Sequence, residues 1–201
     1  MKNLFLVLMF FCLQYSKAVS QTAIEYCNRG DSKDELQDYL GAIQDYNKSI
    51  KMDQKYVRAY YNRSGSKFAI GDYTGMIQDL NKTIELNPKY VNVYNLRGNA
   101  KTVLKDYAGA MLDYSKEIFL NPKNGSAYFN RGGLKMKLKD YRGSIQDFTK
   151  SIQLDPTYWA FGSRGDSKYE LKDKEGACLD WSKAGELGDM EAYEKIKENC
   201  Q

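Results

Sequence analysis

The chain has 201 residues, of which 28% are charged and 42% hydrophobic, the balance of a soluble globular protein of about one domain. It contains no histidine, so the commonest general base and metal ligand is missing. Only three prolines occur, which excludes a proline-rich stalk.

The first twenty residues, 1–20, are expected to be a secretory signal peptide. A positive charge precedes an apolar run at residues 4–13, and the small residues Ala18 and Ser20 suit cleavage after residue 20. Ten residues cannot span about 30 Å of hydrocarbon, which disfavours a membrane anchor. Cleavage removes Lys2 and Lys17 and lowers the formal charge from +4 to +2. We therefore expect export to the periplasm or the cell exterior, with no membrane span and no nucleic-acid partner.

The rest of the chain repeats with a period of about 34 residues. The clearest mark is an arginine followed by Gly or Ser, which recurs at intervals of 34, 34, 34 and 33 positions. A Leu or Ile follows each arginine, and four of the five copies then have Asp-Tyr before a second apolar block. The five arginines are Arg29, Arg63, Arg97, Arg131 and Arg164.

Each copy predicts two amphipathic helices joined by a short corner. In the fourth copy, Ile145, Phe148 and Ile152 follow the i, i+3, i+7 spacing of one helix face. A proline closes three copies, because proline disfavours helix at the preceding residue and has no N–H to donate. One hairpin has too little core alone, so we expect the hairpins to stack.

This pattern resembles the tetratricopeptide repeat family over residues 22–189. The resemblance rests on the period, the small residue in the first helix, the corner tyrosine, and the aromatic residue in the second helix. It implies an all-α fold, a right-handed superhelix of five helical hairpins with a C-terminal capping helix. Ser64, Gln54 and Lys174 depart from the family pattern. The solenoid is expected over 21–201, with repeats at 23–56, 57–90, 91–124, 125–157 and 158–189 and the capping helix at 190–200.

The last repeat carries two further indications. Residues 176–188 resemble the C-terminal repeat of exported tetratricopeptide proteins of Bacteroidetes-type bacteria, which again implies the periplasm or the cell exterior. Cys178 and Cys200 are each 11 residues from Asp189, near the expected turn, so two antiparallel helices would bring them level. We predict a Cys178–Cys200 disulfide, with two unlinked thiols as the alternative, and Cys27 left unpaired.

Each repeat also has a lysine four residues after its arginine and an aspartate in the second helix. Like charges at i and i+4 repel slightly, so five such pairs need a carboxylate between the two cations. We predict that each aspartate, from the same or an adjacent repeat, neutralises an arginine, and the alternative is an anion-binding ladder. The aspartates of this charge ladder are Asp45, Asp79, Asp113, Asp147 and Asp180.

The resemblance implies that ligands contact the inner face of the first helices. An asparagine recurs at one register position there, and its amide can pair with the backbone of an extended peptide. Aromatic side chains nearby can act as anchors, although some of them can equally be core residues between repeats. The candidate contact residues are Asn28, Arg58, Tyr61, Asn62, Asn92, Asn95, Asn99, Phe129, Asn130, Trp159 and Tyr169.

Some family members bind a chaperone C-terminus through a carboxylate clamp. The clamp positions here hold Cys27, Asp31, Asn62, Asn92 and Leu96, and only Asn62 fits, so chaperone-tail binding is disfavoured.

No phosphate-binding loop and no Cys-x-x-Cys motif occurs, so we expect no catalytic residue, no cofactor and no metal. We expect a non-catalytic protein–protein interaction scaffold that binds a peptide or protein segment in its concave groove outside the cytoplasm. The alternative is a structural subunit of a larger cell-envelope or secretion assembly.

Overall fold

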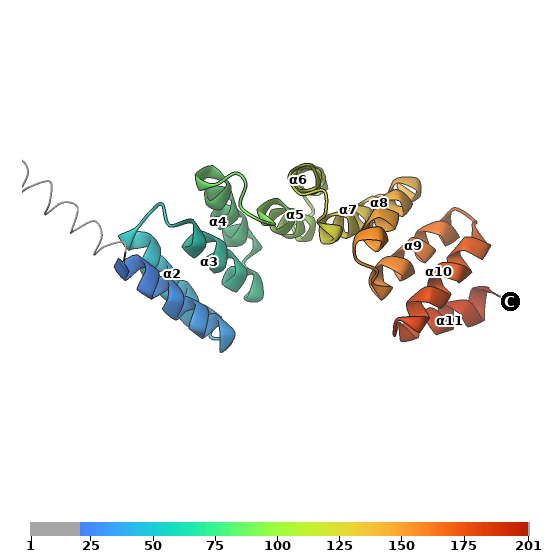
Figure 1. Cartoon of the computed structure of the whole chain (residues 1–201), viewed down its shortest axis with the longest axis horizontal. Coiled ribbons are helices and arrows are strands. Elements are labelled where there is room, and N and C mark those ends of the chain that lie inside the picture. The colour runs from blue at the N-terminus through green and yellow to red at the C-terminus, as the bar shows by residue number, and fades with distance from the viewer. Residues whose placement is uncertain (1–20, 201) are drawn as a thin grey trace, which may run out of the picture. The chain divides into compact units, whose positions relative to one another are not determined.

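The computed structural model describes residues 21–200, and all its regular structure over that range is helical (Figure 1). The expected signal peptide lies outside the described residues. None of the helices within 21–200 combines the length and the apolar character needed to cross a membrane. The elements are a helix over 21–35, then α2 (Tyr39–Met52), α3 (Val57–Ala69), α4 (Tyr73–Leu86), α5 (Val93–Val103), α6 (Tyr107–Leu120), α7 (Gly125–Lys137), α8 (Tyr141–Leu154), α9 (Tyr158–Glu170), α10 (Lys174–Glu186) and α11 (Met190–Asn199).

The helices alternate between two roles, as the repeat predicts. The helix over 21–35, α3, α5, α7 and α9 are the first helices of their hairpins, called A helices below, and α2, α4, α6, α8 and α10 are the B helices. The chain divides into two compact units, Met1–Val93 and Tyr94–Gln201. In the first unit α3 packs on both α2 and α4, and in the second each helix from α6 to α11 packs on the next.

The corner between the two helices of a hairpin is set by three residues. In the fourth repeat, Lys139 has a φ of 64°, Asp140 caps the first turn of α8, and its Oδ1 accepts from Gly143 N at 2.9 Å. A Cβ atom on Gly143 would lie 2.2 Å from the same carboxylate, so a larger residue would displace Asp140 from its capping position. The same cap recurs at Asp38, Asp72, Asp106 and Asp173.

The core of a hairpin forms where the A helix and the B helix approach most closely. A Cβ atom on Gly98 would lie 2.6 Å from the Tyr114 ring, so glycine lets the aromatic ring lie against the A-helix backbone. In the second repeat the B-helix residue is Leu80 instead of an aromatic, and the buried Ser64 replaces the glycine. The departure of Ser64 from the family pattern thus goes together with a different B-helix partner.

The third repeat begins differently from the others. Its register predicts an A helix from Val91, but α5 starts at Val93. Asn92 has a φ of 63° and stays in the turn before the helix, a conformation that asparagine tolerates better than most residues. Asn92 therefore does not lie on the A-helix surface where the sequence places it.

The helix α11 closes the second unit. A disulfide joins Cys178 of α10 to Cys200 with a Cα–Cα distance of 5.9 Å. Ala192 and Ile196 of α11 pack into the cluster around Trp181, so α11 covers the open face of the last hairpin. Cys27 is free and buried.

Candidate functional site

Every repeat holds one ion-pair group that joins its two helices. In the fourth repeat, Arg131 Nε and Nη2 donate to Asp147 Oδ2 and Oδ1, both at 2.8 Å, and Lys135 Nζ lies 2.8 Å from Oδ2. The Tyr128 ring lies under the guanidinium, 5.8 Å from ring centroid to Cζ. The aspartate thus lies between two cations from the A helix of its own repeat. The other groups are Arg29–Lys33–Asp45, Arg63–Lys67–Asp79, Arg97–Lys101–Asp113 and Arg164–Lys168–Asp180.

The same arginines also connect neighbouring repeats. Arg131 Nη1 donates to Ser115 Oγ and Arg164 Nη1 to Thr149 Oγ1, both at 3.1 Å, and each acceptor lies on the preceding B helix. In the first repeat, the hydrogen bonds from Arg29 hold the pKa of Asp45 well below its usual range. Because these charges are satisfied within the protein, the geometry supports a structural role for the ladder over an anion-binding role.

A second polar contact joins the two helices in alternate repeats, and sequence reasoning missed it. In the first, third and fifth repeats the aromatic residue of the B helix donates to an Asp or Asn of the A helix. The second repeat has Leu80 on the B helix and Gly65 on the A helix at these positions, and the fourth has Phe148 and Gly133. Neither Leu80 nor Phe148 carries a hydrogen-bond donor. A side-chain acceptor thus occurs only where the B helix brings a donor, a correlation visible in the repeat alignment. The pairs are Tyr46–Asp31 at 2.8 Å, Tyr114–Asn99 at 2.9 Å and Trp181–Asp166 at 2.9 Å.

In the first unit, three of the predicted contact residues are brought together around Asp31. Asn62 Nδ2 donates to Asp31 Oδ1 at 2.6 Å, and Arg58 forms an ion pair with the other oxygen. Arg58 Nη1 also donates to Asn28 Oδ1 at 3.2 Å. Arg58 and Asn28 are exposed to solvent, whereas Asn62 is half-buried. The first two side chains are therefore accessible to a ligand.

The predicted aromatic contact residue of the first unit is Tyr61. The rings of Tyr61 and Tyr90 are tilted against each other, with centroids 4.7 Å apart. Tyr90 belongs to the segment that connects α4 to the third repeat, so the half-buried Tyr61 packs against that segment.

In the second unit, several of the predicted contact residues have structural partners. Asn95 is buried and accepts from Asn130 Nδ2 at 3.0 Å, so Asn95 positions Asn130 and is not itself open to a ligand. Asn99 accepts from the Tyr114 hydroxyl, and the half-buried Phe129 packs on the Phe148 ring at 5.6 Å. Asn95, Asn99 and Phe129 thus each have a partner within the protein.

Two aromatic residues of α9 complete the predicted set. Trp159 is 61% exposed in the first turn of α9, and its ring lies 4.3 Å from the ring of Tyr158. Tyr169, at the other end of α9, lies 5.5 Å from the Trp181 ring and lines a hollow of about 440 Å³.

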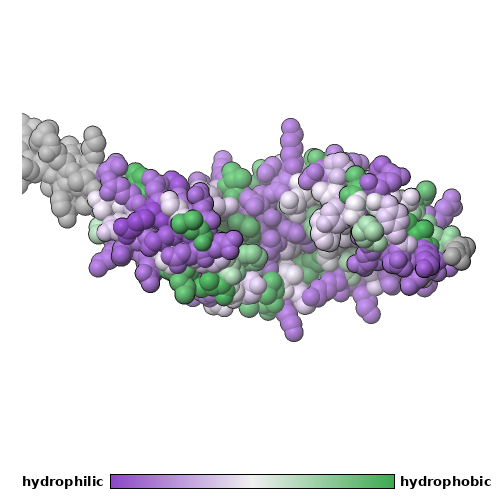
Figure 2. All heavy atoms as spheres, turned by 90° about the horizontal axis from the view of Figure 1, so that it is seen from below, coloured by the Kyte–Doolittle hydropathy of each residue, from purple (hydrophilic) through white to green (hydrophobic). Residues whose placement is uncertain are grey.

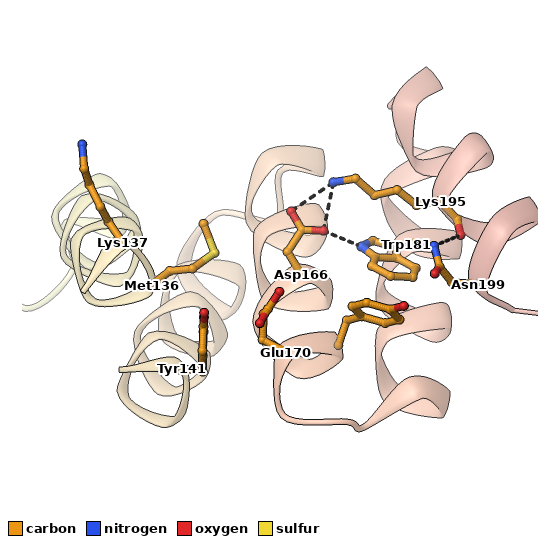
Figure 3. A pocket seen from close by; sticks show the side chains of 9 residues that line it. Met136, Lys137, Tyr141, Asp166, Glu170, Trp181, Lys195 and Asn199 are labelled. Carbon is orange, nitrogen blue, oxygen red and sulfur yellow. Dashed lines mark hydrogen bonds and ion pairs between the residues drawn. The ribbon is translucent and has the colours of Figure 1, made fainter. Parts of the chain in front are cut away.

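This hollow combines apolar and charged walls (Figure 3). Lys195 Nζ lies 2.9 and 3.0 Å from the two oxygens of Asp166, and Trp181 Nε1 donates to the same carboxylate. Burial alone would lower the pKa of Lys195, but the bond to Asp166 raises it above its usual value. The lining residues are Met136, Lys137, Tyr141, Asp166, Tyr169, Glu170, Trp181, Lys195 and Asn199.

The helix α11 takes the place of a sixth A helix in this arrangement. Asp31 and Asp166 occupy the same position in their repeats. Asn62 of α3 contacts Asp31, and Lys195 of α11 contacts Asp166 in the corresponding way. The sequence predicts a cap here but not that the cap contributes a charged side chain to a hollow.

Comparison with known proteins agrees with the repeat geometry. The tetratricopeptide repeat (TPR) family matches residues 26–56, 57–90 and 125–158. The chain is a TPR protein. The predicted all-α solenoid is likewise confirmed by solved structures of the TPR fold.

Three of these structures illustrate the likeness. A crystal structure of MamA is 24% identical, with a TM-score of 0.76 over 89% of this TPR chain and 95% of that one. YrrB, described as a TPR protein with an unusual peptide-binding site, is 18% identical, with a TM-score of 0.74 over 92% and 97%. MamA from Desulfovibrio magneticus RS-1 is 18% identical, with a TM-score of 0.77 over 83% and 94%. At these identities the likeness establishes the fold alone. No curated protein sequence matches the chain.

Much of the surface of this TPR protein is hydrophilic. Figure 2 shows one face, on which apolar side chains appear in several groups between polar ones. Among the large apolar side chains that are more than half exposed are Trp159 on an A helix and Leu112 and Phe119 on a B helix.

Proposed function

We propose that this protein is a non-catalytic scaffold that holds a protein or peptide segment against its A helices. TPR proteins commonly bind such partners, and YrrB carries a peptide-binding site according to its description. The observation that carries the proposal is Trp159, which exposes 61% of its surface on the face where the repeat register places ligand contacts. Tryptophan is a frequent anchor of protein interfaces.

In each of the two units, taken separately, polar side chains on the A helices supply further candidate contacts. Arg58 and Asn28 are exposed and held in position by each other and by Asp31. Asn130 is fixed through its Nδ2 by Asn95, which leaves its amide oxygen to accept from a peptide N–H. Positioned groups of this kind lose little conformational entropy on binding.

We also propose that the protein works outside the cytoplasm. The Cys178–Cys200 disulfide supports this, because such bonds persist in oxidising compartments. The signal peptide and the likeness to exported Bacteroidetes-type proteins stay predictions. Fractionation of the native cell, with thiols alkylated at lysis, should give oxidised protein in the periplasmic or external fraction. Reduced protein in the cytosol would contradict the proposal.

A structural subunit of an envelope or secretion assembly is the second candidate, and one observation favours it. Leu112 and Phe119 of α6 are 73% and 78% exposed and lie on one helix face. The other B helices carry Gln or Leu at the first position and Lys, Glu or Gln at the second, so the pair is specific to the third repeat.

Affinity purification from the native cell distinguishes the two candidates. The experiment compares the unaltered protein with Trp159→Ala on an A helix and Phe119→Ala on a B helix, each of which removes one exposed ring. The scaffold proposal expects the partner to be lost with Trp159→Ala and kept with Phe119→Ala. The reverse pattern would support the structural subunit.

A further inference from the structure

We propose that the hollow between α7, α8, α9, α10 and α11 binds a basic side chain, Arg or Lys, of an extended peptide. This inference rests on the proposed function, because it assigns ligand chemistry to one part of the A-helix surface. The volume of about 440 Å³ lies in the lower part of the range of ligand pockets, which suits one or two side chains.

The walls of the hollow suit the apolar stem of such a side chain. Trp181 and Tyr169 lie on one side with their rings 5.5 Å apart, and Met136 lies on the other. Figure 3 shows the Met136 side chain directed toward α9, across from Trp181. A long basic side chain places its methylene groups along surfaces of this kind and keeps its charged end at a polar group.

A carboxylate without a cationic partner supplies the polar group. Among residues 21–200, no lysine or arginine lies within salt-bridge distance of Glu170. Its neighbour in the hollow is Tyr141, whose pKa is raised by desolvation and by the Glu170 charge. Glu170 is exposed and hydrogen-bonded to Tyr141, and a guanidinium or ammonium there would pair with it as Lys195 pairs with Asp166.

The cations that line the hollow are directed to other groups. Lys195 holds both oxygens of Asp166 and lies 3.4 Å from Glu191. Lys137 Nζ lies 5.2 Å from the centroid of the Tyr107 ring, and Figure 3 shows its ammonium pointing away from the other labelled side chains. An acidic ligand would meet Glu170 without a free cation to bind, so the charge pattern favours a basic ligand.

The position of Lys195 depends on the cap. Asn199 Nδ2 donates to the Lys195 carbonyl at 2.9 Å, and the disulfide to Cys200 follows directly. The two contacts fix the last turn of α11, so this wall is formed before a ligand arrives.

Peptide titration followed by the Trp181 indole N–H signal in ¹H–¹⁵N NMR tests the inference. The chain has two tryptophans, so comparison with Trp159→Phe assigns the Trp181 signal, and the titrations use the protein with Trp159 in place. The probes are three acetylated and amidated tripeptides with leucine at both ends and arginine, citrulline or glutamate in the middle. The test variant is Glu170→Gln, and the matched control is Glu186→Gln, an exposed glutamate outside the lining of the hollow.

The arginine peptide should shift the Trp181 signal and bind about tenfold more tightly than the citrulline peptide, which has the same shape without the charge. Glu170→Gln should abolish this preference and Glu186→Gln should keep it. Equal binding of the arginine and citrulline peptides, stronger binding of the glutamate peptide, or no shift at all would overturn the inference. None of these results touches the proposed function, which depends on whether Trp159→Ala loses the native partner.

Discussion

Arg131 and Asp147 meet in a two-point contact, with two guanidinium nitrogens each 2.8 Å from a different carboxylate oxygen. The contact joins an A helix to its B helix, and the third nitrogen reaches Ser115 of the preceding repeat. One side chain thus connects three helices. Because the group recurs in every repeat, its loss should affect the stack more than any single surface ion pair would.

Arg131→Met should lower the free energy of unfolding by about 3 kcal/mol, because it leaves the buried Asp147 with Lys135 as its one remaining cation. Urea denaturation followed by circular dichroism measures the change. Lys150→Met removes an exposed lysine from the neighbouring α8 and should stay within about 0.5 kcal/mol. A loss from Arg131→Met as small as that of the control would contradict the structural role of the ladder.

The ladder should also make stability depend on pH in the acidic range. The pKa of Asp45 is lower in the folded protein than the value of about 3.9 expected for the unfolded chain. Its stabilising contribution is therefore complete at neutral pH and is lost as the pH falls below about 4. Asp45→Asn should be less stable at pH 7 but lose less stability between about pH 5 and pH 2. Parallel pH profiles for the two proteins would exclude this role.

The disulfide should stabilise the capping helix. Cys178 and Cys200 close a loop of 22 residues, for which chain entropy gives about 3 kcal/mol. Cys178→Ser with Cys200→Ser should lower stability by roughly this amount and speed amide exchange most in α11. Exchange that accelerates evenly along α7, α8 and α11 would show instead that the cap is not a local unit.

The alternating polar contact can be measured as a coupling energy. Tyr114→Phe removes the hydroxyl that donates to Asn99, and Asn99→Ala removes the acceptor. A double-mutant cycle should give a coupling of about 1 kcal/mol, the usual size of such a hydrogen bond. As a control, Phe148→Leu is combined with Asn99→Ala. Because Phe148 belongs to the fourth repeat and Asn99 to the third, the losses of stability from these two substitutions should be additive. A coupling near zero for the first pair would mean that the alternation has another cause.

Cys27 should be unreactive in the folded protein. Burial raises the pKa of its thiol to about 11, so almost no thiolate exists at pH 8. Iodoacetamide should label Cys27 only after unfolding, at a rate that follows urea concentration. Fast labelling of the native protein would show that the first hairpin opens readily. The same burial would keep the unpaired Cys27 from forming a disulfide outside the cytoplasm, where we propose that the protein works.

The sequence predicts the arginine–aspartate ladder and the corner positions because both recur in register, and the structure adds that each aspartate belongs to the same repeat as its arginine. The spacing from Arg131 to Asp147 is fixed by one hairpin, and the Asp140 cap is a local hydrogen bond. Five copies of the same pattern make such contacts visible, since a residue that recurs in register must have a recurring partner.

The contacts between repeats are harder to predict. The contacts of Asn62 with Asp31 and of Lys195 with Asp166 depend on how one hairpin stacks on the next. The residue types at these positions are not the same in every repeat, so the repeat pattern does not reveal the contacts. The hollow beside Trp181 needs the position of α11, which the repeat does not specify. Asn92 lies before α5 and not within it, because its own positive φ places the start of the helix at Val93.

The central proposal is that the A helices, and not the B helices, contact the partner. Site-specific photo-crosslinking in the native cell tests it most directly, with p-benzoylphenylalanine placed at position 159 on α9 or at position 119 on α6. The proposal predicts one reproducible adduct from position 159 that is absent from position 119, although the two side chains are similarly exposed at 61% and 78%. An adduct from position 119 with none from position 159 would contradict it.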